Sequence, residues 1–267
     1  WDGRINRSDL TDFFGISVPQ ASLDIARYSE LAPQNLSYDR SSRVYQVTGD
    51  FHALSKESQP QKYLSELLAS ATGVIEPAAS FIGWRPSVDC VPQPGRVVES
   101  ATLATLLKAI REGTGIKVVY QSMSRPEPSA RIIAPHALAY DGFRWHVRAF
   151  CHSRGEFRDF VLGRILEVQG IEPAGNIASE DSEWHKMLTL VLAPHPGLSE
   201  GKRRAIELDY GMKDGEAKLE CRQALLFYTL KRLGLDSQAS QAPEAQQIVL
   251  KNQAELAHLL SASPSTN

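Results

Sequence analysis

The chain has 267 residues, of which 42% are hydrophobic, and a formal net charge of −2. This length allows two or three domains with packed cores, and the near-neutral charge means that any nucleic-acid contact must come from a local basic surface. Cys90, Cys151 and Cys221 form no CxxC pair, which argues against a disulfide framework and a zinc ribbon. No apolar run reaches the roughly 18 residues of a membrane span, and the polar first residues do not resemble a signal peptide. A cytoplasmic protein is the simplest expectation.

Residues 1–50 are predicted to begin with two short helices. Ser8 can cap a helix that runs to Phe14, Gly15 breaks this helix, and Ser17 can cap a second helix that ends near Glu30. Helix, glycine-containing turn and helix form the helix-turn-helix pattern. Inward-facing positions on the second helix are expected at Leu23, Ile25 and Ala26.

A hairpin is predicted directly after these helices. Residues 36–38 and 43–47 alternate around the polar turn 39–42, and a hairpin in this position is a wing. A winged helix normally has a further helix packed across these two. We therefore expect the native N-terminus to lie upstream of Trp1.

A recognition helix reads base edges in the major groove through its first residues, and a wing contacts phosphates. The residues predicted to contact DNA are Ser17, Gln20, Ala21, Ser22, Arg27, Arg40 and Arg43. Residues 1–50 also contain five Arg against seven Asp or Glu. A helical fragment that only contacts other proteins is therefore the alternative.

Two further segments follow. In residues 51–98, a connector, we predict a helix at 61–71 and extended chain at 86–95. Residues 99–176 are predicted to form a small mixed domain, with a helix that stops at Gly113 and strands at 116–121, 130–134, 143–151 and 157–165. Short strands at this spacing indicate a small antiparallel barrel.

The strand at 143–151 carries an unusual basic face. Alternation places Arg144, His146 and Arg148 on this face, and Trp145, Val147 and Ala149 on the core side. Arg158 and Arg164 are expected to share a face of the next strand with Phe160 and Leu162. Like charges this close repel one another. Either an anion binds there, or Asp141, Glu156 and Asp159 balance the charge, and the pattern leaves both open.

Residues 185–260 are predicted to form a third, α/β unit. We expect strands at 188–192 and 248–250, helices at 199–208, 219–233 and 253–260, a loop at 237–243, and a frayed tail after Leu260. One stretch has more apolar surface than a small unit needs: Leu225, Leu226, Tyr228, Leu230 and Leu233. This surface predicts a dimer interface, with an ordinary intradomain core as the alternative.

The segment 142–151, GFRWHVRAFC, resembles the signature of WYL domains, with Trp145-His146-Val147 in place of Trp-Tyr-Leu. The lead-in at 131–138 and the closing stretch at 157–165 also match that family. With the winged helix before it and an extension after it, the resemblance covers nearly the whole chain. The His-Val form, together with the segment 120–123, YQSM, is most similar to WYL repressors beside phage-defence operons of the BREX and CBASS kinds.

This resemblance implies a homodimeric regulator that binds a palindromic operator. Its WYL domain would have an Sm-like or SH3-like barrel and would sense a nucleotide or nucleic-acid fragment. The matching pocket positions are Tyr120, Ser122, Arg131, His136, His146, Arg148, Arg158 and Arg164. Tyr120 or Phe150 would stack on a base, and Ser122 and His136 would supply hydrogen bonds. The departure at His146 and Val147 leaves open whether the ligands of Tyr-Leu members carry over.

Enzymatic function has little support in the sequence. No P-loop, GxSxG or GxGxxG motif is present. His136, His146, Cys151 and His152 lack metal-ligand spacing, so we expect no metal, cofactor or catalytic residue. We predict an α+β multidomain repressor with no catalytic activity. A nucleic-acid-binding accessory protein and a nucleotide-processing enzyme are the alternatives.

Overall fold

A computed structural model describes residues 1–55, 59–174, 178–236 and 242–260. The chain folds as two units, Trp1–Gln93 and Pro94–Asn267. Most of the predicted loop at 237–243 and the whole tail after Leu260 lie outside the described residues. Within the described part, no helix is long and apolar enough to cross a membrane, and no group of three metal-ligating side chains is found.

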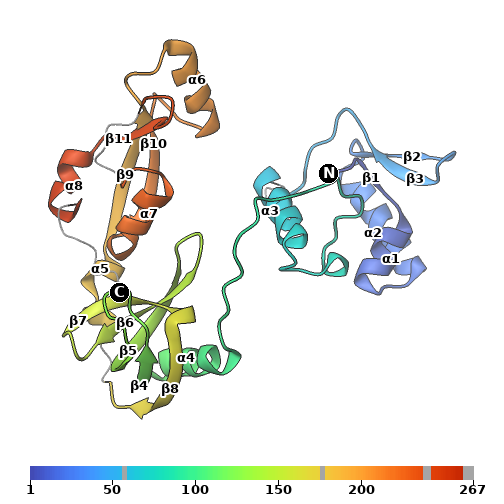
Figure 1. Ribbon diagram of the computed structural model, residues 1–267. Coiled ribbons are helices and arrows are strands. Elements are labelled where there is room, and N and C mark those ends of the chain that lie inside the picture. The colour runs from blue at the N-terminus through green and yellow to red at the C-terminus, as the bar shows by residue number, and fades with distance from the viewer. Residues whose placement is uncertain (56–58, 175–177, 237–241, 261–267) are drawn as a thin grey trace. The chain divides into compact units, whose positions relative to one another are not determined.

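The first unit begins with the two predicted helices, α1 (Arg7–Phe14) and α2 (Val18–Leu31) (Figure 1). Ser17 caps α2 as predicted. The cap of α1 is Asn6 rather than Ser8, because Asn6 and Asp9 form a reciprocal capping box. Gly15 ends α1 in the left-handed conformation that glycine adopts without strain.

The buried face of α2 differs from the predicted one. Ala21 and Ile25 are buried, four residues apart on one helix face, whereas Leu23 and Ala26 are exposed. The inward prediction was therefore wrong for Leu23 and Ala26 and is confirmed for Ile25.

The wing is a three-stranded antiparallel sheet with the order β1-β3-β2. The predicted hairpin is β2 (Leu36–Asp39) and β3 (Val44–Val47), and β1 (Arg4–Ile5) adds an unpredicted edge strand. Buried Asn35 ties the hairpin to its surroundings through Tyr28 and His52. After the wing, the predicted connector helix is α3 (Pro60–Ala71), followed by a 3-10 turn at Pro77–Ala79.

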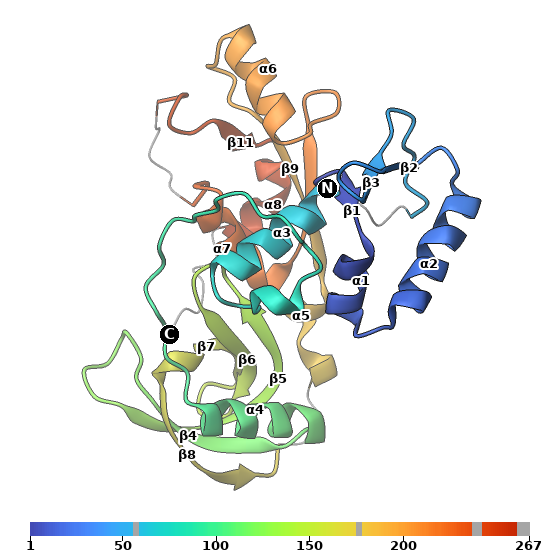
Figure 2. The same ribbon diagram turned by 90° about the vertical axis from the view of Figure 1, so that its right-hand side faces the viewer.

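The second unit starts with α4 (Ser100–Glu112), which ends at Gly113 as predicted. The helix packs on a five-stranded antiparallel sheet with the order β7-β6-β5-β4-β8 (Figure 2). The strands are β4 (Gly115–Tyr120), β5 (Ser129–Tyr140), β6 (Trp145–Cys151), β7 (Glu156–Val161) and β8 (Ile165–Glu172).

This sheet corrects two predictions. No strand pairing among the described residues joins β7 to β8, so the expected barrel is an open sheet. The predicted single strand at 157–165 is interrupted by a 3-10 turn, Leu162–Arg164. Arg164 lies in this turn and therefore does not share a strand face with Arg158.

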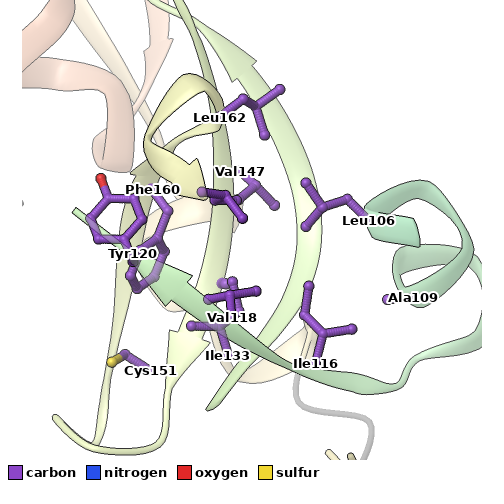
Figure 3. Close-up of a cluster of buried hydrophobic side chains, with 12 residues drawn as sticks. Leu106, Ala109, Ile116, Val118, Tyr120, Ile133, Val147, Cys151, Phe160 and Leu162 are labelled. Atoms are coloured by element: carbon purple, nitrogen blue, oxygen red, sulfur yellow. The ribbon is translucent and has the colours of Figure 1, made fainter. Parts of the chain in front are cut away.

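The core of the sheet contains Val147 and Ala149 as predicted, but Trp145 is half exposed and packs on Tyr140 instead. Tyr120 lies fully buried in this core (Figure 3). Its hydroxyl accepts the backbone N–H of Val161 at 3.2 Å. The prediction that Tyr120 can stack on a base was therefore wrong, because its ring is already enclosed.

The rest of the second unit is a small α/β domain. Its antiparallel sheet has the order β10-β9-β11 and consists of β9 (Met187–Pro194), β10 (Ala217–Arg222) and β11 (Ile248–Leu250). Its helices are α5 (Ser182–His185), α6 (Glu200–Asp209), α7 (Leu226–Arg232) and α8 (Gln253–Leu260). The predicted helix at 219–233 is instead the end of β10, a 3-10 turn at Gln223–Leu225, and α7.

Three of the five apolar residues assigned to a dimer interface pack inside this domain. Leu226 and Leu230 belong to one buried cluster with Leu188 and Leu190, and Leu233 packs on a second cluster. For these three leucines the intradomain core is the correct interpretation, because Leu226 and Leu230 pack with side chains of β9 and β10.

Candidate functional site

The exposed face of α2 is the candidate base-reading surface. Gln20, Asp24 and Arg27 are exposed at helical spacing, and Leu23 between them is 65% exposed. Gln20 Nε2 donates to Asp24 Oδ1 at 2.8 Å, which orients the Gln20 amide along this face. Sequence analysis missed Leu23, because it assigned this apolar side chain to the core.

Of the other residues predicted to contact DNA here, Ser17 and Ser22 bond to the backbone of α2 and Ala21 is buried. The hydroxyl of Ser17 accepts the Gln20 N–H at 3.3 Å, and the hydroxyl of Ser22 donates to the Val18 carbonyl at 2.9 Å. Ala21 has no exposed surface. The prediction that Ala21 contacts a thymine methyl group was therefore wrong, because α2 turns this residue into the core of its own unit.

The tip of the wing presents Arg40 and Arg43 to solvent. Asp39 organises this turn by accepting hydrogen bonds from the Ser41 N–H at 2.8 Å and the Ser42 hydroxyl at 2.6 Å. The Ser42 and Ser41 bonds lower the pKa of Asp39. Arg43 has a φ of 58°, so the turn holds a conformation that few non-glycine residues adopt. Both arginines thus stand on an ordered turn.

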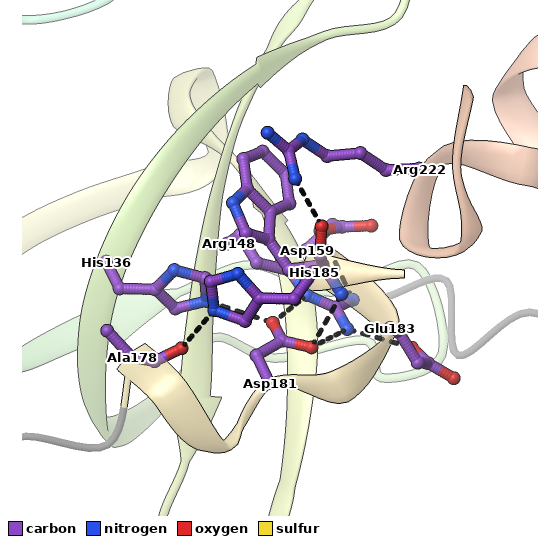
Figure 4. A network of polar contacts seen from close by, with 9 residues as sticks. His136, Arg148, Asp159, Ala178, Asp181, Glu183, His185 and Arg222 are labelled. Atoms are coloured by element: carbon purple, nitrogen blue, oxygen red, sulfur yellow. Dashed lines mark hydrogen bonds and ion pairs between the residues drawn. The ribbon is translucent and has the colours of Figure 1, made fainter. Parts of the chain in front are cut away.

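In the second unit, Arg148 on β6 is the centre of a buried ion-pair network (Figure 4). Its guanidinium binds Asp181 with two hydrogen bonds, of 2.7 and 3.0 Å, and donates to Glu183 at 2.8 Å. Asp159 on β7 lies 3.5 Å away. His136 on β5 contacts Asp181 at 2.9 Å. Arg148 is only 3% exposed, and its charge is met by carboxylates of the same chain.

The network joins the five-stranded sheet, called the β4–β8 sheet below, to the α/β domain that follows it. Asp181 is also the N-cap of α5, since its carboxylate accepts the Trp184 N–H. The Trp184 carbonyl accepts a hydrogen bond from Arg222 at the end of β10, and the Arg222 guanidinium stacks 4.7 Å from the Trp184 ring. A short helix is therefore held by β6 on one side and by β10 on the other.

Charge and burial shift the ionisation of this network in opposite directions. Burial alone would raise the pKa of Asp181, but hydrogen bonds from His136 and Arg148 hold this pKa well below its ordinary value. Burial raises the pKa of Asp159 despite the attraction of Arg148 and His146. The Arg148–Asp181 pair thus stays ionised, whereas burial shifts Asp159 towards protonation.

A second carboxylate neutralises the rest of the basic face. Asp141 accepts hydrogen bonds from Arg144 Nε at 3.1 Å and from the backbone N–H groups of Phe143 and Arg144, and it contacts His146 Nε2 at 2.9 Å. Burial opposes ionisation of Asp141, yet the bonds from His146 and the backbone lower its pKa to about 2. Carboxylates of the same chain therefore balance the charge of Arg148 and Arg144 and bind Nε2 of His146. This is the second of the two explanations for the basic face.

The eight predicted ligand residues do not all line one cavity. Arg131 is buried, with its guanidinium 5.9 Å from the Tyr120 ring, and the hydroxyl of buried Ser122 lies 3.2 Å from that of Ser124. Arg158 pairs with Glu156 on its own strand. His136 and Arg148 belong to the Asp181 network. Phe150, the other predicted stacking residue, packs on Phe157 and His152.

His146 and Arg164 do line one common cavity of about 250 Å³. Its wall includes Arg144, Asp159 and Tyr228. Tyr228 comes from α7, and its ring centre lies 4.9 Å from that of His146. The cavity is therefore shared by the β4–β8 sheet and the domain after it. Sequence analysis missed the contribution of α7, because it assigned that segment to a dimer interface.

Comparison with known proteins matches each part of this architecture to a family model. Residues 1–69 match the BrxR transcriptional regulator winged helix-turn-helix domain, 101–169 the WYL domain, and 187–256 the BrxR transcriptional regulator C-terminal dimerization domain. A winged helix, a WYL domain and a dimerisation domain in this order define a WYL-type transcriptional regulator, and this confirms the predicted fold class.

Three relatives are each called "DNA-binding transcriptional repressor CapW". The chain is 50% identical over 261 residues to the protein of Escherichia coli (strain KTE188) and 49% identical over 261 residues to that of Pseudomonas aeruginosa, covering 97% of this chain and 87% of each relative. It is 46% identical over 258 residues to that of Stenotrophomonas maltophilia, with 96% and 86% covered. The chain belongs to the CapW family of BrxR-type WYL regulators. Members of this family are named as repressors and not as enzymes, in agreement with the prediction.

Among solved structures, the chain aligns with proteasome accessory factor B/C (PafBC) of Arthrobacter aurescens at 18% identity and a TM-score of 0.29. The alignment covers 95% of this chain and 44% of that one, so the chain spans less than half the length of PafBC.

Proposed function

We propose that the protein binds a palindromic operator as a homodimer and represses a phage-defence operon in the bacterial cytoplasm. A phosphate-bearing ligand in the WYL domain relieves this repression. The observation that carries the proposal is the cavity lined by His146, Arg144 and Arg164, whose wall is completed by α7 of the dimerisation domain. A ligand there contacts both domains, so its binding energy can favour one arrangement of them over another.

DNA recognition is assigned to α2 and the wing. Gln20, Leu23 and Arg27 face solvent on one side of α2 and supply an amide, an apolar group and a cation to the major groove. Ser17 and Ser22 flank this face. Arg40 and Arg43 contact phosphates from the ordered wing turn.

In this proposal two copies of the chain bind one operator, and residues 187–256 form the interface between them. This segment matches a dimerization domain, and the large apolar side chains exposed among its described residues are Met187, Leu208, Tyr210 and Leu219. Residues of this kind, rather than the buried face of α7, are available to a second copy.

Within the WYL domain, the assigned ligand contacts are those that line the cavity. His146 and Arg164 are retained from the predicted set, and Arg144 joins them. Arg148, His136 and Asp181 act from behind the cavity by holding Asp159 and α5 in place. The remaining predicted residues, Ser122, Arg131 and Arg158, are not among the residues that line this cavity, and no role in ligand binding is proposed for them.

Replacing Gln20 with alanine should weaken binding to the operator by about 1–3 kcal/mol, because a glutamine amide can form two hydrogen bonds with adenine. Electrophoretic mobility shift on the DNA upstream of the protein's own operon measures this change. Binding to random DNA should stay the same. Equal binding of operator and random DNA by Q20A and the parent would show that another face of α2 reads the bases.

The matched control is the double variant Arg40→Ala/Arg43→Ala. Loss of two phosphate contacts should weaken operator and random DNA alike and should reduce the slope of log affinity against log salt by about 2. The two variants thus separate base reading from phosphate contact.

A further inference from the structure

One carboxylate lies within the face of α2 that is assigned to base reading. Asp24 is exposed on this face with Gln20 and Arg27, and Gln20 Nε2 donates a hydrogen bond to Asp24 Oδ1 at 2.8 Å. No ion pair between the described residues involves Asp24. Because DNA is a dense row of negative phosphates, an unpaired carboxylate on this face weakens binding to DNA of any sequence. A role in selecting the sequence would offset this loss.

The hydrogen bond fixes the direction in which the Gln20 amide faces. A carboxylate only accepts hydrogen bonds, so the group of Gln20 that faces Asp24 must be its NH2 group and not its carbonyl oxygen. One of the two amide N–H groups is therefore used within the helix. Gln20 keeps one N–H donor and the Oε1 acceptor for contact with a base.

The two groups that remain on Gln20 match adenine. In the major groove adenine presents the N7 acceptor beside the N6 amino donor, whereas guanine presents two acceptors, N7 and O6. A glutamine with one donor and one acceptor can form two hydrogen bonds with adenine. Two hydrogen bonds with guanine would need both N–H groups of the amide, and Asp24 already binds one of them.

The charge of Asp24 acts in the same direction as its hydrogen bond. Asp24 follows Gln20 by one helical turn and contacts its amide, so the carboxylate lies beside the base that Gln20 reads. Its negative charge repels the N7 and O6 acceptors of guanine and attracts an amino group such as N6 of adenine. Both effects disfavour guanine at this position.

We infer that Asp24 is a specificity-determining residue, which makes the position read by Gln20 select adenine over guanine. This inference rests on the proposed base reading by α2 and deepens it. Asp24 is a positioning residue here, because it acts through the amide of Gln20. It weakens binding to all DNA and in exchange increases the difference between two purines.

The test first locates the base pair that Gln20 reads. The full chain selects binding sequences from a pool of DNA duplexes with a randomised segment, and Gln20→Ala is put through the same selection. The base pair whose preference is lost in Q20A is the one that Gln20 reads. Two duplexes of the selected sequence are then made that differ only at this pair, with A·T in one and G·C in the other. Fluorescence anisotropy measures the affinity for each of them and for a random duplex.

Three variants separate the hydrogen bond of Asp24 from its charge. Asp24→Ala removes both, whereas Asp24→Asn removes the charge and keeps an oxygen that can accept from Gln20. The matched control, Glu30→Ala, removes another exposed carboxylate of α2. Both positions are exposed, so the melting temperatures of all three variants should match that of the parent.

The parent should prefer the A·T duplex by about tenfold, within the range for one bidentate contact. Asp24→Ala should reduce this preference to less than about threefold and should raise the affinity for random DNA by about twofold or more. Asp24→Asn should raise the affinity for random DNA equally but keep part of the preference for A·T. Glu30→Ala should keep the whole preference.

Two results would overturn the inference and leave base reading by α2 intact: guanine selected at the Gln20 position by the parent, or an unchanged preference for A·T in Asp24→Ala. A parent that selects no sequence, or a Q20A variant that selects the same sequences as the parent, would overturn the proposed base reading together with the inference.

Discussion

Arg148→Ala should lower the free energy of unfolding of the second unit by about 3–5 kcal/mol. The substitution removes the guanidinium that faces Asp181, Glu183 and Asp159 and leaves these carboxylates without their shared cation. A urea titration followed by tryptophan fluorescence measures the change. Sequence analysis assigned this residue to ligand binding, whereas its burial and its partners predict a structural loss first.

Two further variants separate the contribution of the pair from general damage. Arg148→Lys keeps the charge but cannot reproduce the two-pronged contact with Asp181, so an intermediate loss is expected. Arg203→Ala removes an exposed arginine of the same unit and should change stability by less than about 0.5 kcal/mol. A loss below about 1 kcal/mol for Arg148→Ala would show that Arg148 contributes no more than an exposed ion pair does.

Ala21→Asp should unfold much of the winged helix. Ala21 is completely buried on the inner face of α2. An aspartate there would bury a charge without a partner, at a cost of several kcal/mol. Thermal unfolding followed by circular dichroism should show an early loss of helical signal, and DNA binding should fall with it.

The matched control for this substitution is Ala26→Asp on the same helix. Ala26 is exposed, so the same change of residue should alter stability by less than about 1 kcal/mol. If both variants melt at the temperature of the parent, Ala21 faces solvent, and a contact between Ala21 and a DNA base becomes possible again.

Local signals predicted many of the elements correctly. Ser17 and Gly113 mark helix ends through side-chain capping and left-handed backbone, which depend on neighbouring residues only. Alternation correctly placed Val147 and Ala149 in the core. It failed for Trp145, at the end of its strand, where the ring lies over Tyr140 rather than over the core.

The candidate ligand site depended on contacts that no local pattern contains. Asp181 and Glu183 lie 33 and 35 residues after Arg148 in the chain, and Tyr228 lies still further from His146. The basic residues on one strand face predicted that negative charge lies nearby. The pattern did not show which residues supply it. The one signal within reach was the Asp181-Ser182-Glu183 segment, an acidic helix start of the kind that can face an arginine.

The central claim is that a phosphate-bearing ligand releases a dimeric repressor from its operator. Fluorescence anisotropy of labelled DNA from upstream of the protein's own operon tests it directly. Nucleotides and short 5′-phosphorylated oligonucleotides are titrated into the preformed complex, and isothermal titration calorimetry identifies those that bind and the concentrations that saturate the ligand site. The account predicts that operator affinity falls by about tenfold or more, within the range of typical allosteric coupling. Operator affinity that stays unchanged while the ligand site is full would contradict it.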